Sequence, residues 1–464
     1  MSGQVVDRIL VRFEGEGSGV EDLTWGQLAQ WQSIIVSGQS RTLGGISGLP
    51  PGTTVEDVAD DLRYAMGRHQ ALRTRLRLDG EVDEDGDIIP RQECSAAGEF
   101  ALEVVDAGDD DPAEVAVAVL QRRQTVPFDY ENEWPIRMSV VRKDGVLTQL
   151  VAVYLHLVID AGGLEVLIAD GAARPRDGSD PTPVTAMQPL DQARWQQGPA
   201  GQRLNASAQR YLEHTLRAVP MSRFGEPRYP GPPGFREVRY RSPALLLAVG
   251  AASIRCQANT SSVLLASFAV ALGRIAGRTP ILAMLTVSNR FRPRLGESVS
   301  ALAQVSPYVS DVADITIGEA VGRAERSTLS AYKNAYFDPI QQDDVYRRVF
   351  AERGGAIDLS CYYNDRRQRT LAPPTGPVAT ADEIRAALAS STHERVDDPE
   401  MPGTKLYLYV DDPPGSIDLL MSVDLRYFSP DDLLTIVREI ESVAVNIALD
   451  PSLPTEVRAP ATVR

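Results

Sequence analysis

One stretch of the chain joins a predicted strand to a predicted helix and carries polar residues at the junction. An apolar run begins near Leu147, and residues 151–159 alternate with a period of two and include β-branched side chains, which predicts a strand. On such a strand His156 and Asp160 point to the same side. Gly162-Gly163 would end the strand, and apolar residues at helical spacing then predict a helix with Gly171 as its C-cap.

This junction has the residue types of a proton-transfer site. The unperturbed pKa of a histidine, about 6.5, lets His156 take or hold a proton near neutrality. The N–H groups around Gly162, helped by the dipole of the following helix, could face a developing oxyanion. The alternative is a buried histidine whose nitrogen atoms are satisfied by hydrogen bonds.

Length and composition bound the protein class. A chain of 464 residues is too long for one simple core, so we expect two lobes. A hydrophobic content of 43% and a charged content of 24% are typical of soluble globular proteins. The net charge of −16 and the isoelectric point near 4.9 argue against nucleic acid and anionic membrane surfaces as partners.

The cysteines and the apolar runs indicate a compartment. Cys94, Cys256 and Cys361 are widely spaced, make no metal-ligand pattern and cannot all pair within one chain, so a reducing cytoplasm fits best. No signal-peptide pattern is visible at the N-terminus. No uncharged apolar run reaches ~18 residues, so we expect no membrane span.

Other segments give a coarse order of elements. Thr24 and Gln27 have the spacing of a capping box at a helix start. The Gly/Pro/Ser-rich residues 38–52 predict a loop. Apolar periodicity predicts helices over 55–66 and 260–275, and residues 281–287 predict a buried strand that ends at Ser288.

The histidine stretch resembles the His-His-x-x-x-Asp-Gly signature of nonribosomal peptide synthetase condensation domains, which belong to the chloramphenicol-acetyltransferase-like superfamily. His156 matches the second, catalytic histidine, and Asp160 matches the structural aspartate. Two positions depart from the signature. Leu155 replaces the first histidine, and Ala161 replaces the glycine, with Gly162 one place later.

Further segments resemble the family in the expected order, over nearly the whole chain. Residues 67–76 are similar to its Arg-His-x-x-Leu-Arg-Thr-x-Phe motif, with Leu76 in place of the aromatic residue. Residues 363–367 look like a segment of stand-alone actinobacterial condensation-like proteins. Residues 296–308 are only loosely similar to the segment that forms a channel wall in the family.

The resemblance implies an α/β fold with mixed sheets, arranged as a V-shaped pseudo-dimer of two chloramphenicol-acetyltransferase-like lobes. We expect an N-terminal lobe over 1–180, with the His156 loop, and a C-terminal lobe over 181–464, with a channel wall and a crossover strand. The active site would lie between the lobes and be reached by a channel from each face.

The resemblance also implies roles for single residues. His156 and Gly162 would be catalytic. A buried Asp160 needs a cation, because an unpaired buried charge costs ~3–5 kcal/mol; Arg290 is the first choice and Arg73 the second. No metal site is evident. The substrate channel would be lined by Tyr154, Ser288, Ser306, Tyr363 and Asn364.

The implied activity is that of a free-standing, monomeric acyltransferase of antibiotic biosynthesis. It would move an acyl or aminoacyl group from a carrier-protein phosphopantetheine thioester to an amine or hydroxyl, forming an amide or ester, with no bound cofactor. Arg122-Arg123 and Arg366-Arg367 are candidate basic patches for the acidic carrier, or else scattered surface charge.

Two alternatives remain. Leu155 and Ala161 favour a catalytically degenerate domain that binds a carrier protein or recruits a partner enzyme. A modified chemistry, such as hydrolysis, cyclisation or dehydration, is the other, although His156 argues against the family's heterocyclising branch.

Overall fold

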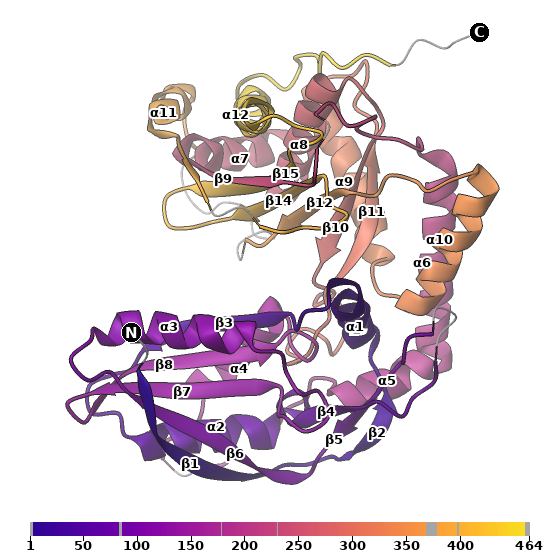
Figure 1. The fold of residues 1–464 in the computed structure, drawn as a ribbon. Helices are drawn as coiled ribbons and strands as arrows, with labels where there is room; N and C mark the ends of the chain where they lie inside the picture. The colour runs from indigo at the N-terminus through magenta and orange to yellow at the C-terminus, as the bar shows by residue number, and fades with distance from the viewer. Residues whose placement is uncertain are drawn as a thin grey trace. The chain divides into compact units, whose positions relative to one another are not determined.

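The chain folds into two compact units, each built on a mixed sheet flanked by helices (Figure 1). The computed structural model describes residues 3–82, 86–177, 179–229, 231–367, 378–396 and 399–459. The first unit comprises Met1–Asn205 and Ser288–Gln304, and the second comprises Ala206–Val287 and Val305–Arg464. The α/β class is as expected. The expected lobe boundary after residue 180 stays a prediction, and the compact units divide the chain differently.

The sheet of the first unit has the order β1-β6-β7-β8-β3. Its members are β1 (Gln4–Glu14), β6 (Ala97–Asp106), β7 (Ile136–Lys143), β8 (Val146–Leu155) and β3 (Thr42–Gly48). The β6–β7 pair is parallel and the other pairs are antiparallel. β7 and β8 form a hairpin, and its turn uses Asp144 and Gly145 with φ of 51° and 78°. Positive φ at both central residues matches the twist of a tight hairpin.

The prediction of a loop over residues 38–52 is wrong, because this segment contains β3. β3 pairs antiparallel with β8, from Thr42 opposite Leu155 to Gly48 opposite Gln149. Its glycines conceal the alternation that marks a strand, while pairing with β8 satisfies its backbone groups. β8 is therefore an interior strand of the sheet.

Helices cover both faces of this sheet. α3 (Pro112–Thr125) packs Val115 and Val119 against Val151 on one face. α2 (Val55–Arg68) and α4 (Ala161–Ala172) lie on the other face, and α2 and α3 run on opposite sides of the sheet in Figure 1. Because side chains alternate along a strand, the even-numbered residues of β8 point toward α2 and α4.

The rest of the first unit surrounds a small second sheet of order β2-β5-β4. Its strands are β2 (Gly19–Asp22), β5 (Arg91–Cys94) and β4 (Thr74–Arg77), with the 3₁₀ helix η1 (Gln70–Arg73) leading into β4. α1 (Trp25–Ser37) begins with the predicted capping box between Thr24 and Gln27. α5 (Pro189–Gln197) packs on β2, and α6 (Pro199–Ala218) continues into the second unit.

The second unit contains a seven-stranded sheet of order β11-β10-β12-β14-β15-β9-β13. The strands are β11 (Gln304–Ser310), β10 (Ile281–Val287), β12 (Cys361–Asp365), β14 (Leu406–Asp411), β15 (Ile417–Asp424), β9 (Phe235–Ser242) and β13 (Thr392–Arg395). The predicted strand 281–287 is β10. It runs parallel to β12, and β12 runs parallel to β14.

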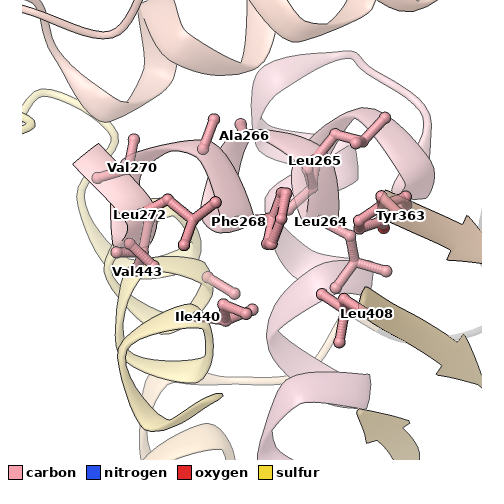
Figure 2. Packing of buried hydrophobic residues seen from close by; sticks show 14 of the residues in the cluster. Leu264, Leu265, Ala266, Phe268, Val270, Leu272, Tyr363, Leu408, Ile440 and Val443 are labelled. Atoms are coloured by element: carbon pink, nitrogen blue, oxygen red, sulfur yellow. The ribbon is translucent and has the colours of Figure 1, made fainter. Parts of the chain in front are cut away.

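Four helices form the main core of the second unit with this sheet. They are α7 (Pro243–Cys256), α8 (Thr260–Ala276), α9 (Ile317–Lys333) and α12 (Pro430–Leu449). Figure 2 shows Phe268 of α8 packed with Tyr363 of β12 and Ile440 of α12 nearby. The remaining helices of this unit are α10 (Pro339–Arg353), α11 (Ala381–Ala387) and η2 (Leu388–Ser390).

Within the described ranges no single helix is long and apolar enough to cross a membrane. α7 and α8 together meet the criterion by length and composition, and they are bent by 106° at the break between them.

Candidate active site

The strand that leads to His156 ends one residue before it. β8 stops at Leu155, residues 156–158 form a turn, and Asp160 is the N-cap of α4. The prediction that His156 and Asp160 share a strand face is therefore wrong. The capping bond from Gly163 N–H to Asp160, at 2.7 Å, favours the helix start over further strand. Gly171 lies inside α4, whose C-cap is Ala173.

The carboxylate of Asp160 is buried and receives four hydrogen bonds. Oδ1 accepts from the N–H of Gly163 and, at 2.5 Å, from Nη2 of Arg290. Oδ2 accepts from the N–H groups of Leu302 and Ala303, at 2.8 and 3.0 Å. A carboxylate with both oxygen atoms so engaged is held in place. The geometry favours a structural role for Asp160.

Arg290 is the cation that pairs with Asp160, which confirms the first-choice prediction for this partner. It also donates from Nη1 to the carbonyl of Ser298 at 2.7 Å, and from Nη2 to the carbonyl of Ser300 at 3.2 Å. These bonds tie the turn before α4 to residues 288–304, which belong to the same compact unit as His156. Gln192 supports this segment by donating to the hydroxyl groups of Ser298 and Ser300.

Gly162 is required by the close approach of Arg290. A Cβ atom at this position would lie 2.3 Å from Nε and 2.8 Å from Cδ of Arg290. Ala161, one place earlier, is exposed, so its methyl group meets no such obstacle. Gly162, which follows one place after the glycine position of the signature, therefore leaves the space that the Arg290–Asp160 ion pair requires. Among the described residues the N–H of Gly162 has no hydrogen-bond partner, and it lies in the first turn of α4.

His156 is half-buried, and the N–H of its backbone donates to the carbonyl of Arg41 at 2.8 Å. Its Nδ1 atom is buried without a hydrogen-bond partner in the described part of the chain. Burial is the main cause that lowers the pKa of His156 below 6.5. Arg41 lowers this pKa further, whereas Asp160 and the backbone of His156 and Ile159 oppose the shift. A neutral imidazole at pH 7 can accept a proton.

Arg41 is the site residue that sequence reasoning missed. Because Thr42 pairs with Leu155, Arg41 lies across the ladder from His156, and side chains opposite each other share a face. Its Nη1 donates to the hydroxyl of Ser33 at 3.1 Å. No carboxylate in the described ranges forms an ion pair with Arg41. Predicting that residues 42–48 pair with the strand before His156 would have revealed Arg41 as a neighbour of this histidine. The glycine-rich composition of residues 42–48 made that pairing impossible to recognise from the sequence.

Arg73 does not pair with Asp160, so the second expectation for this partner is wrong. The side chain is fully buried and donates to the carbonyl groups of Glu16, Gly17 and Ser95, with the last two at 2.8 and 2.5 Å. Its position at the end of η1 directs it into the small sheet. Arg73 therefore holds loops beside that sheet together.

The residues expected to line a channel fall into three environments. Tyr154 is 9% exposed and lines a cavity within the first unit, and Ser288 is exposed after β10. Ser306 is fully buried, and Tyr363 lies in the core of the second unit beside Phe268 (Figure 2). Alternation along β11 and β12 turns these two side chains inward, so their burial does not favour a channel role. Asn364 is half-buried on the opposite face of β12 from Tyr363.

The candidate basic patches are largely neutralised. Arg123 pairs with Glu103, Arg366 pairs with Asp411 at 2.5 Å, and Arg367 pairs with Asp365 at 2.7 Å. Only Arg122 of the four arginines has no ion pair among the described residues. The described ranges also contain no cluster of three His, Cys, Asp or Glu side chains arranged as metal ligands.

Solved structures similar to this chain are condensation and condensation-like domains. SgcC5 from Streptomyces globisporus matches with a TM-score of 0.66 and 20% identity, covering 93% of this chain and 100% of SgcC5. A condensation domain that mediates chain release from the enacyloxin polyketide synthase matches with a TM-score of 0.70 and 20% identity, covering 97% of this chain and 86% of that chain. The X-domain from teicoplanin biosynthesis, in its complex with OxyB, gives 0.69 and 18%, covering 98% and 99%.

The similarity of these structures, with TM-scores of 0.66 to 0.70, shows the shared two-lobed chloramphenicol-acetyltransferase-like fold. A search among curated proteins gave no match to the sequence. The family model for the condensation domain matches residues 48–343, which include the complete segment from β8 to α4 and the Arg290 segment. The chain therefore belongs to the condensation-domain family.

Proposed function

We propose that this protein is an acyltransferase that moves an acyl or aminoacyl group from a carrier-bound phosphopantetheine thioester to an amine or hydroxyl acceptor. The observation that carries the proposal is the arrangement around Asp160. Four donors fix this carboxylate at the start of α4. The same turn presents a half-buried neutral imidazole and the N–H of Gly162, which has no hydrogen-bond partner among the residues that the structure describes. A positioned base beside a free backbone donor suits acyl transfer.

The reaction follows from these groups. The acceptor nitrogen or oxygen attacks the thioester carbonyl carbon while His156 takes its proton, or holds it in place as charge develops. The carbonyl oxygen becomes negative and receives the N–H of Gly162. The C–S bond then breaks, and the phosphopantetheine thiolate recovers a proton. General bases contribute ~10²–10⁴-fold and one oxyanion donor ~3–4 kcal/mol in comparable enzymes.

The test uses the full chain, a panel of carrier proteins loaded with acyl and aminoacyl groups, and amine and hydroxyl acceptors. Mass spectrometry detects the amide or ester. His156→Ala is expected to reduce product formation by at least ~10²-fold. His393→Ala is the matched control, because His393 is exposed on β13 of the second unit and should leave the rate unchanged. Product formed by His156→Ala at the wild-type rate would refute the catalytic role.

A second candidate is a degenerate domain that binds a carrier protein or recruits another enzyme. Leu155, which replaces the first histidine of the signature, is 3% exposed in the core, and the related X-domain was solved in complex with a second protein, OxyB. For this candidate a loaded carrier would bind the wild-type chain and His156→Ala with equal affinity, and neither would form product. Binding measured by calorimetry beside the product assay separates the two functions.

A further inference from the structure

The first unit contains a cavity that the acyl-transfer proposal has not used. Its volume is about 520 Å³, within the ~300–1,000 Å³ that ligand pockets commonly have. It lies between α2 and α4 on one side and β7 and β8 on the other, elements that Figure 1 shows in the same part of the fold. All its lining residues fall between positions 49 and 176, so the cavity is complete within one compact unit.

Most of the lining is apolar, and most of its polar groups already have partners. Apolar side chains come from each wall, including Leu62, Ala65, Met138, Leu150 and Leu167. Asp61 pairs with Arg174 and Arg176 at 2.7 and 2.8 Å. Asp57 serves the capping box of α2, and the hydroxyl of Thr53 donates to the carbonyl of Pro50. An occupant of this cavity would find few hydrogen-bonding groups along the walls.

Tyr154 is the exception. Tyr154 is 9% exposed, and it lines the cavity from β8. In the described part of the chain its hydroxyl forms no hydrogen bond, and its oxygen is not among the fully enclosed side-chain atoms that lack a partner. Burial raises the pKa of Tyr154 to about 12, so the hydroxyl keeps its proton at neutral pH and remains a donor. Because this hydroxyl opens onto the cavity, it can donate to an atom of a bound ligand.

The cavity runs along the strand that ends at the candidate catalytic histidine. Tyr154 precedes His156 by two residues, and Leu150 lies four residues further back on the same face of β8. At ~3.3 Å per residue, the lining from Leu150 to Tyr154 extends about 13 Å. A chain-shaped ligand could lie here with its polar end at Tyr154, near the turn that carries His156.

We propose that this cavity binds the unbranched acyl chain of a thioester donor, with the Tyr154 hydroxyl donating to a polar atom at the thioester end. The proposal deepens the acyltransferase function and rests on it for the identity of the donor. The cavity selects donors with a long apolar chain over acetyl or polar aminoacyl donors, because its walls offer apolar contact area and few partners for polar groups.

The test measures binding by calorimetry, with no turnover required. The probes are pantetheine thioesters of acetate, butyrate, octanoate and dodecanoate, with free octanoate as a comparison. Affinity should rise about fourfold per added methylene until the cavity is full. Tyr154→Phe should weaken every thioester by about three- to tenfold, independent of chain length.

Variants that fill the cavity test whether the acyl chain binds there. Ala65→Phe places a ring in the cavity from α2, and Leu150→Phe does so from β8, so a folding failure in one leaves the other. In each variant, the affinity should stop rising at a shorter acyl chain than in the wild type. Ala113→Phe is the control, because Ala113 is exposed at the start of α3.

Three results would overturn the inference: affinity that does not depend on chain length, affinity for long chains that survives both filling variants, or free octanoate that binds as well as its thioester. Binding as predicted, but with no acyl transfer to any acceptor, would instead refute the proposed function and leave the acyl-chain site standing.

Discussion

The carboxylate of Asp160 and the guanidinium of Arg290 meet at 2.5 Å although 130 residues separate them in the sequence. The side chains are 5% and 14% exposed, so the pair is largely removed from water. Asp160 caps α4, and Arg290 packs on Gly162 and holds residues 298 and 300. The pair therefore joins three chain segments around the turn of His156.

Arg290→Gln should destabilise the first unit by about 3–5 kcal/mol, because Asp160 would remain buried with only its backbone donors. The free energy of unfolding can be followed in urea by tryptophan fluorescence. All four tryptophan residues, Trp25, Trp31, Trp134 and Trp195, lie in the first unit, so the signal reports this unit.

Arg194→Gln is the control for that measurement. Arg194 pairs with Glu21 in the same unit, but its side chain is 54% exposed, so its loss should cost no more than about 1 kcal/mol. In the double variant Asp160→Asn/Arg290→Gln the cost should be smaller than the sum of the single costs. Additive costs would show that the two side chains act independently.

The fold was predictable wherever periodicity was strong. The alternation of β8, the apolar stripe of α8 and the capping box at Thr24 each gave the observed element. β3 could not be found in this way, because a strand rich in glycine shows no alternation and is specified by its pairing with β8. Tertiary pairing decided the structure there, and local sequence did not.

Gly162→Ala should destabilise the first unit by about 1–3 kcal/mol, since the new Cβ would overlap Nε and Cδ of Arg290 and push the guanidinium from Asp160. Gly171→Ala in the same helix is the matched variant. No atom lies within 4 Å of a Cβ there, and replacing a helical glycine should stabilise by about 0.5–1 kcal/mol. Urea unfolding of both variants gives opposite signs if the close approach at Gly162 is correct.

For the site, the sequence predicted the Asp160–Arg290 pair, but could not give the environment of His156. The signature motif places the histidine and the aspartate, and a buried carboxylate requires a cation. The neighbour that depends on strand register, Arg41, and the burial that lowers the imidazole pKa arise only when β3 and β8 are paired. The burial of Ser306 and Tyr363 could not be predicted for a related reason, because motif position does not tell which face of a strand is buried.

Arg73→Met should cost several kcal/mol, because the part-buried carbonyl groups of Gly17 and Ser95 would each lose a bond to the charged donor of a fully buried side chain. The same change should leave the pKa of His156 unaltered, since Arg73 makes no bond to the turn that carries this residue. Nuclear magnetic resonance of the imidazole gives the pKa, and urea unfolding gives the stability. A shift of the His156 titration in Arg73→Met would contradict the separation of the two groups.

The pKa of His156 is lower in the folded protein than its ordinary value of 6.5. The unfolded chain therefore binds more protons at this residue, so its contribution to stability is fully present above pH 6.5 and is lost as the pH falls below that value. His156→Gln has no imidazole to protonate, so its stability does not fall with pH for this reason. The difference in unfolding free energy between wild type and His156→Gln should thus change on acidification, by at most about 1.4 kcal/mol per pH unit.

Arg41→Gln should raise the pKa of His156, because it removes a positive charge that disfavours the imidazolium across the β3–β8 ladder. Arg63→Gln is a control, since Arg63 lies on α2 and is paired with Asp60. Imidazole resonances recorded between pH 4 and 8 would measure the shift directly, and any base-dependent activity should fall at a correspondingly higher pH in Arg41→Gln. An unchanged titration would mean that the guanidinium of Arg41 lies too far from His156 to act on it, and the lowered pKa would then follow from burial alone.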